Sequence, residues 1–119
     1  MPHPILIVEN DPRWHQMLDE VSVNLGYTTY QARIAREALH LVRKTDFALI
    51  LMDIKLPGIQ GHVLLRQLRK DKMAIPVIVV AGYLTPEVVE TLVDSRVHEI
   101  IVKSEFRVRR LADAIASAL

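Results

Sequence analysis

The fold is decided by one stretch, Ala48-Leu49-Ile50-Leu51-Met52-Asp53-Ile54-Lys55-Leu56-Pro57-Gly58-Ile59-Gln60-Gly61. Its apolar run ends abruptly in the carboxylate of Asp53, and a loop with one proline and two glycines follows. Such a run is typical of a strand that is buried on both faces of a parallel sheet. Asp53 then lies at the carboxyl end of its strand, where open α/β sheets place their ligand sites. Taken alone, an aspartate at this point also fits a turn former or a helix cap.

Composition sets the class of protein. The chain has 119 residues, half of them apolar, and we expect one domain over residues 1–119 with no effector domain. No apolar run approaches the roughly 20 residues that cross a membrane, and no signal-peptide pattern precedes the first strand. The absence of cysteine excludes a disulfide framework and a thiolate metal site. A net charge of +1 gives no argument for direct nucleic-acid binding. We therefore expect a cytoplasmic domain without a membrane or nucleic-acid partner.

Five strand-like runs alternate with five helical patterns along the chain. The predicted strands cover 5–8, 27–32, 48–52, 76–81 and 99–102, and the helices lie near 12–25, 35–44, 63–70, 86–93 and 108–119. Asp11 and Pro12 suit a helix start, and Gly26 suits a helix stop. Alternation of this kind predicts an α/β fold: a flavodoxin-like, doubly wound (βα)5 sandwich with a five-stranded parallel sheet in the order 2-1-3-4-5.

Helical spacing also selects side chains for the buried faces of these helices. Trp14 and Met17 fit the stripe of the first helix, so we expect them in the core. Val93 fits the buried face of the fourth helix, and Val108 belongs to the stripe of the last helix.

The carboxyl ends of the first and third strands meet where the strand order reverses. Glu9, Asn10 and Asp53 are expected to converge there, with Ala81 and Lys103 on the same edge. Oxygen ligands of this kind suit Mg²⁺, and a lysine can neutralise an anion that lies beside the metal. A carboxylate in such surroundings can attack a phosphoryl group and form an acyl phosphate.

Four segments, in this order and at this spacing, resemble the receiver domain of two-component response regulators over nearly the whole chain: Ile5–Asp11, Leu51–Gly61, Ile75–Val80 and Ile101–Lys103. The resemblance implies phosphorylation of Asp53 and a phosphate-binding role for Lys103. It implies a Mg²⁺ site built from Glu9, Asn10, Asp53 and the backbone carbonyl of Lys55.

The resemblance also implies partners. The phosphoryl donor would be a histidine kinase or a phosphotransfer protein, and the signal would pass to an output protein or domain. In this family the side formed by the fourth helix, the fifth strand and the last helix commonly serves for output or for a homodimer. Arg107, Arg109 and Arg110 lie at the start of that last helix, where a charge cluster equally fits a solvated face.

The chain departs from the family pattern at five positions. Asn10 stands where the family has a metal-binding aspartate, so we expect weaker Mg²⁺ binding. Ala81 replaces the Thr or Ser of the switch pair, and Ile100 replaces its aromatic partner. Ser104 replaces the proline after the lysine, and Arg96 replaces a glycine before the fifth strand.

Two further residues are candidates for the same site. The ammonium group of Lys55 would partly replace the charge of Mg²⁺, or would pair with Asp53. The alternative interpretation is a solvated surface lysine, which is the usual state of an exposed lysine. Tyr83 follows Ala81 and Gly82 and would place an aromatic group near the site.

The leading hypothesis is therefore a phosphorylatable signalling module, not a substrate-turnover enzyme, although it would catalyse its own phosphotransfer and dephosphorylation. The alternative is a degenerate receiver that binds a partner without phosphorylation, which Asn10, Ala81 and Ile100 favour. A third class is a flavodoxin-like cofactor binder or a small phosphatase. A cofactor binder needs a phosphate-holding loop after the first strand, where this chain has the acidic run Glu9-Asn10-Asp11-Pro12.

Overall fold

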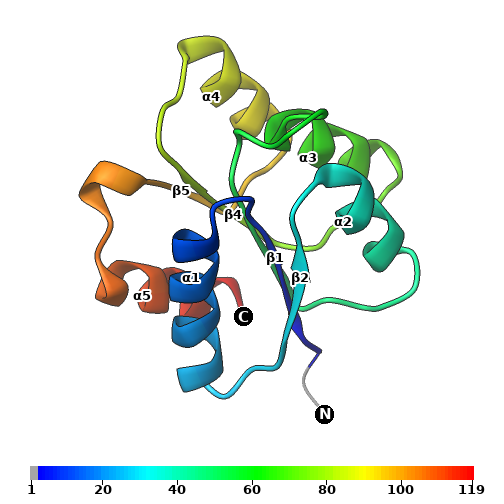
Figure 1. The fold of residues 1–119 in the computed structure, drawn as a ribbon. Coiled ribbons are helices and arrows are strands. Elements are labelled where there is room, and N and C mark those ends of the chain that lie inside the picture. The colour runs from blue at the N-terminus through cyan, green and yellow to red at the C-terminus, as the bar shows by residue number, and fades with distance from the viewer. Residues whose placement is uncertain (1–2) are drawn as a thin grey trace.

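A computed structural model describes residues 3–119 of the chain. One parallel sheet holds five strands in the order β2-β1-β3-β4-β5 (Figure 1). The strands are β1 (Ile5–Val8), β2 (Thr29–Ala32), β3 (Leu49–Met52), β4 (Val77–Ala81) and β5 (Glu99–Val102). The fold class and the strand order predicted from the sequence are confirmed.

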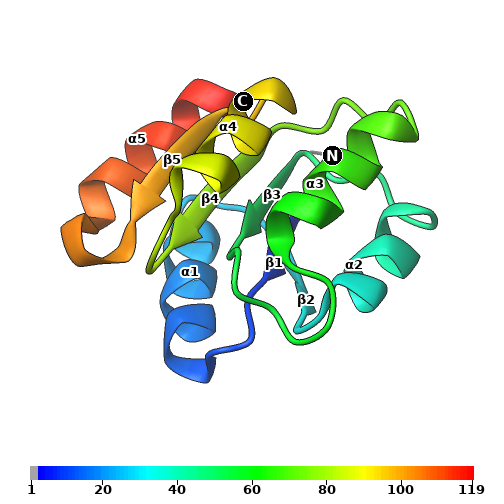
Figure 2. The same ribbon diagram turned by 90° about the horizontal axis from the view of Figure 1, so that it is seen from above.

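Helices cover the two faces of the sheet. On one face lie α1 (Pro12–Asn24) and α5 (Val108–Ala118), and on the other lie α2 (Ala35–Val42), α3 (Gly61–Lys70) and α4 (Pro86–Asp94). The view from above in Figure 2 shows the two layers on either side of the strands. A short 3-10 turn, η1 (Lys103–Glu105), connects β5 to the loop before α5.

Side-chain alternation along the strands produces two cores. Ile5 and Ile7 of β1 face α1 and α5, whereas Leu6 and Val8 face the helices of the opposite layer. All four side chains are fully buried. Each such side chain contributes roughly 1.5–3 kcal/mol through its burial. This two-sided burial explains why β1 and β3 are continuous apolar runs.

Local capping fixes where two of the helices begin. An oxygen of the Asp11 side chain accepts hydrogen bonds from the backbone N–H of Arg13 at 2.9 Å and of Trp14 at 3.5 Å. The Thr85 hydroxyl accepts one from the backbone N–H of Val88 at 3.2 Å at the start of α4. Such caps satisfy backbone donors that have no partner within the helix.

The third helix begins at Gly61, two residues before the predicted start at Val63. The backbone N–H of Gly61 donates to the carbonyl of Ile54 at 2.8 Å, which brings the helix start against the end of β3. A Cβ atom at Gly61 would lie 2.1 Å from the carbonyl oxygen of Asp53. This close approach requires glycine.

Three of the expected core positions are wrong. Met17 is 38% exposed, Val93 is 61% exposed and Val108 is 56% exposed. Each lies on the margin of its apolar stripe, beyond the surface that the sheet and neighbouring helices cover. Met17 and Val108 instead line a groove of ≈ 420 Å³ on the outer side of α1 and α5. No helix within residues 3–119 is long and apolar enough to span a membrane.

Candidate functional site

Two carboxylates meet at the carboxyl edge of the sheet. Val8 of β1 is aligned with Met52 of β3, so the next residues, Glu9 and Asp53, emerge side by side. Glu9 is 1% exposed and Asp53 is 6% exposed. Lys103, at the end of β5, bridges them: its Nζ lies 2.9 Å from Glu9 Oε1 and 3.0 Å from Asp53 Oδ2. The structure therefore brings together three of the residues selected from the sequence.

The backbone holds the second oxygen of each carboxylate. Asp53 Oδ1 accepts a hydrogen bond from the backbone N–H of Ile54 at 2.7 Å. Glu9 Oε2 accepts one from the backbone N–H of Asp11 at 3.0 Å. Both side chains are thus fixed in orientation before any ligand arrives, and Asp53 presents Oδ2 to the lysine.

Burial and neighbouring charges set the protonation of the site. Burial raises the pKa of Glu9, and the negative charge of Asp53 raises it further, while the Asp11 N–H and the Lys103 ammonium oppose the shift. Burial lowers the pKa of Lys103, but its contacts with Glu9 and Asp53 outweigh that effect, so the net pKa is raised. Lys103 is therefore charged at neutral pH. When Glu9 and Asp53 are both ionised, two negative groups face one positive group, an arrangement that favours an added cation.

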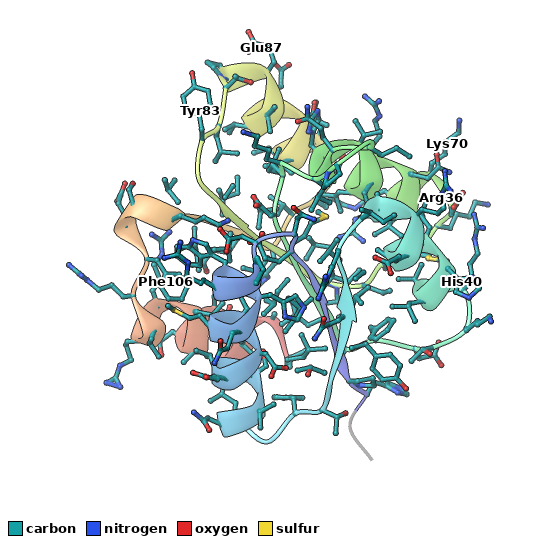
Figure 3. The ribbon with its side chains drawn as sticks, viewed as in Figure 1. Arg36, His40, Lys70, Tyr83, Glu87 and Phe106 are labelled. Atoms are coloured by element: carbon teal, nitrogen blue, oxygen red, sulfur yellow. The ribbon has the colours of Figure 1, made fainter. Side chains whose placement is uncertain are left out.

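The site opens into two adjoining clefts, and Asp53, Lys55 and Lys103 line both. The first, of ≈ 410 Å³, is bounded on its other side by the turn after β1 and includes Asn10. The second, of ≈ 440 Å³, extends toward α4 and includes Tyr83. Tyr83 is 83% exposed and projects from the loop between β4 and α4 (Figure 3). The sequence-based placement of Tyr83 near the site agrees with this position.

An aromatic pair, which the sequence did not assign to the site, adjoins the lysine. The Lys103 Nζ lies 5.0 Å from the centre of the Trp14 ring, within cation–π range. Trp14 meets Phe106 edge to face, with ring centres 5.1 Å apart and planes at 85°. Trp14 does pack against the core on the α1 side, as predicted. The missed signal was its place in the first turn of α1, three residues after Asp11.

A family model described as "Response regulator receiver domain" matches residues 5–116. The chain belongs to the receiver domain family of response regulators.

Two curated relatives are similar to part of this receiver domain. A probable transcriptional regulator, ycf29, of Pyropia yezoensis is 36% identical over 80 residues, which are 66% of this chain and 36% of that protein. The cell cycle response regulator CtrA of Brucella ovis is 27% identical over 78 residues, which are 66% and 34%. The matched segments span about a third of those relatives.

Solved structures agree over nearly the full length. A CheY-like response regulator receiver domain protein from Methanospirillum hungatei JF-1 has a TM-score of 0.91 and 28% identity, covering 98% of this chain and 93% of the other. The signal receiver domain of a signal transduction histidine kinase from Syntrophus aciditrophicus has a TM-score of 0.87 and 29% identity, with coverage of 98% and 89%.

The two positions that the resemblance assigns to the switch pair have no polar or aromatic group. Ala81 is fully buried at the end of β4, and its neighbour Gly82 is the residue that lines the cleft. Ile100 is half-buried in β5 and packs against the core on the side of α2, α3 and α4. Neither side chain can form a hydrogen bond to a phosphoryl group.

Receiver domains generally bind Mg²⁺ at their acidic pocket. Here Glu9, Asn10, Asp53 and Lys55 line one cleft, so the oxygen ligands suit that ion in kind. They suit it less well in charge, because the exposed Asn10 contributes a neutral amide. In the described part of the chain, no cluster of three or more His, Cys, Asp or Glu side chains is placed to hold a metal. The residues thus fit a weakened Mg²⁺ site.

The structure also shows the surroundings of the candidate Lys55 and of the two remaining departures, Ser104 and Arg96. Lys55 is exposed, and among residues 3–119 no ion pair joins it to Asp53, so the predicted pairing is not present. The peptide bond before Ser104 is trans, as are all the peptide bonds in the described part. Arg96 has a φ of 58°, a left-handed conformation that glycine adopts without strain.

Proposed function

We propose that this receiver domain accepts a phosphoryl group on Asp53 from a phosphohistidine of a histidine kinase or phosphotransfer protein, and then signals to an output protein or domain. One observation carries the proposal: the Lys103 ammonium lies 3.0 Å from Asp53 Oδ2 at the meeting point of two open clefts. A carboxylate and a fixed cation at this distance supply both the acceptor and the charge that an incoming phosphoryl group needs.

The transfer balances without further reactants. A carboxylate oxygen of Asp53 attacks phosphorus, and the P–N bond to the donor histidine breaks. The donor ring is protonated on its other nitrogen, so it leaves with the bonding electrons as a neutral imidazole. Lys103 stabilises the charge on the phosphoryl oxygens, while the Ile54 N–H holds the other carboxylate oxygen. Mg²⁺, when bound by Glu9, Asn10, Asp53 and the Lys55 carbonyl, supplies additional positive charge.

The same groups support loss of the phosphoryl group to water, so the domain acts as a self-modifying acceptor in the cytoplasm and not as a turnover enzyme. We place its output on the face of α4, β5 and α5, where a homodimer would also form. Arg110 on that face lies 3.5 Å from Glu99 and donates to the Ile100 carbonyl at 3.0 Å. These contacts connect the surface of α5 to the strand that leads to Lys103.

A second candidate is a phosphate-independent interaction module. The neutral Asn10 favours it because the metal site loses charge. Ala81 and Ile100 favour it because the family's hydroxyl and aromatic ring are both missing.

Intact mass after incubation with acetyl phosphate, with and without Mg²⁺, separates the two candidates. The proposal predicts a gain of one phosphoryl group that requires both Asp53 and Mg²⁺. Asp53→Asn is the control, and its circular dichroism spectrum must match that of the wild type. The absence of any gain in a folded wild-type protein would favour the phosphate-independent module.

A further inference from the structure

Besides the two carboxylates, Lys103 contacts the ring of Trp14 with its ammonium group. Its ammonium group touches Glu9 and Asp53 on the acidic side, and the ring of Trp14 on the other. Ala81 and Ile100 offer no group that can follow a phosphoryl oxygen. A charge change at Asp53 therefore reaches the rest of the fold through Lys103 more directly than through β4.

Trp14 is in contact with both ends of one short turn. Lys103 begins η1, and the backbone N–H of Phe106 donates to the Lys103 carbonyl at 3.2 Å. The indole ring meets the Lys103 ammonium on one side and the Phe106 ring on another. Figure 3 shows Phe106 beside the loop that leads into α5, on the side of the molecule where α1 lies. Phe106 is followed, two residues later, by the first residue of α5.

We propose that Trp14 is the positioning residue of the phosphoacceptor site. Its ring, supported by Phe106, holds the Lys103 ammonium against Asp53 and connects that ammonium to the start of α5. The inference rests on the proposed function, because the connection is used when Asp53 is phosphorylated. Under this proposal, phosphorylation of Asp53 is coupled to the rest of the fold on the side of α1 and α5. Ala81 and Ile100, at the two switch positions, cannot provide that coupling.

The energetics favour such a connection. Phosphorylation adds negative charge at Asp53 and draws the ammonium toward the new oxygens. Cation–π attraction falls away beyond about 6 Å, so a small shift of a cation 5.0 Å from the ring centre changes it. Trp14 is half-buried and packs edge to face on Phe106. If the indole ring followed the Lys103 ammonium, Phe106 would therefore move as well.

A second edge-to-face pair in the molecule supplies a matched control. Tyr30 and Phe47 have ring centres 5.4 Å apart and planes at 82°. Phe47 precedes β3, whereas Asp53 follows it, so this pair lies toward the opposite edge of the sheet. A loss of aromatic packing at Phe47 tests the effect of general destabilisation alone.

Trp14 is the only tryptophan in the chain, so its fluorescence reports on this contact directly. Wild-type protein is incubated with acetyl phosphate and Mg²⁺, and intact mass and emission are followed on the same sample. We expect the emission to change in step with the mass, and we expect Phe106→Leu to reduce that change while Phe47→Leu preserves it.

The rate of phosphorylation tests the positioning role. Trp14→Leu should slow the mass gain by about fivefold, the loss expected for one cation–π contact, while Trp14→Phe should stay within about twofold of wild type. A mass gain with constant emission, or equal slowing by Phe47→Leu and Trp14→Leu, would overturn the inference and leave the proposed function standing. No mass gain in the wild type would overturn both.

Discussion

A negative charge introduced at position 10 should strengthen the binding of Mg²⁺. Asn10 is exposed and lines the cleft that contains Glu9 and Asp53. Asn10→Asp adds a unit negative charge without a significant change in side-chain size. At a separation of about 4 Å, its attraction to a divalent ion is about 2 kcal/mol at the dielectric constant of water and about 8 kcal/mol at an effective value near 20, before desolvation is subtracted.

The exposure of Asn10 selects the lower end of that range. An attraction of about 2 kcal/mol corresponds to a roughly 30-fold tighter dissociation constant. Isothermal titration with MgCl₂ at neutral pH measures it directly, at constant ionic strength because salt screens exposed charges. The domain should then also take up a phosphoryl group from acetyl phosphate at lower Mg²⁺ concentrations.

Asn24→Asp is the matched control for this substitution. Asn24 is also exposed and lies at the far end of α1, a helix of 13 residues. At 1.5 Å per residue it is close to 20 Å from the acidic cleft, well beyond a Debye length of about 8 Å at physiological salt. Equal Mg²⁺ affinities in wild type and Asn10→Asp would refute the electrostatic reasoning, as would an equal gain in Asn24→Asp.

Three further substitutions test other parts of the site. Lys103→Met removes the cation between the buried Glu9 and Asp53, so urea denaturation at neutral pH should show a loss of about 3–5 kcal/mol. Because burial raises the pKa of Glu9, that loss should shrink as pH falls and Glu9 protonates, and an undiminished loss at pH 5 would contradict this explanation. Gly61→Ala forces a Cβ atom to within 2.1 Å of the Asp53 carbonyl oxygen and should cost about 1–3 kcal/mol by the same assay, as overpacking does. Burial lowers the pKa of His15 below 6.5, so its contribution to stability is present above that pH and lost as pH falls through the folded-state pKa. His15→Leu should therefore reduce the fall in melting temperature between neutral pH and pH 5, and an identical fall in the variant would exclude His15 as its cause.

The sequence was sufficient for the fold because the three central strands, β1, β3 and β4, are buried on both faces. A run such as Leu49–Met52 has little alternative to a central parallel strand, and alternation with helices then restricts the strand order. The limits of the helices were less certain. Gly61 is a helix start because its backbone N–H reaches the Ile54 carbonyl, a contact between two segments that neither segment reveals alone.

The sequence predicted the site residues that follow strands. It did not predict those whose position depends on how a helix is turned about its own axis. Glu9, Asp53 and Lys103 each follow a strand, so the strand order alone brings them to one edge. Trp14 fits the apolar stripe of α1, and helical spacing does not reveal that its ring also faces Lys103. Met17 shows the same limit, because spacing defines the apolar side of a helix but not how much of that side its neighbours cover.

The residues that match the family pattern and those that depart from it have different roles in the proposed function. In the proposed phosphotransfer, Asp53 and Lys103 are the groups that the bond to phosphorus needs, and their side chains lie 3.0 Å apart, with Asp53 buried. Under the same proposal, Asn10 would alter the charge available to a metal, while Ala81 and Ile100 would alter the response of the fold after the bond has formed. Replacement of the switch pair would therefore change how the signal leaves the site, and it would leave the phosphotransfer chemistry at Asp53 intact. Trp14 and Phe106 provide another route from the same lysine, so phosphorylation and an unusual readout are compatible in one domain.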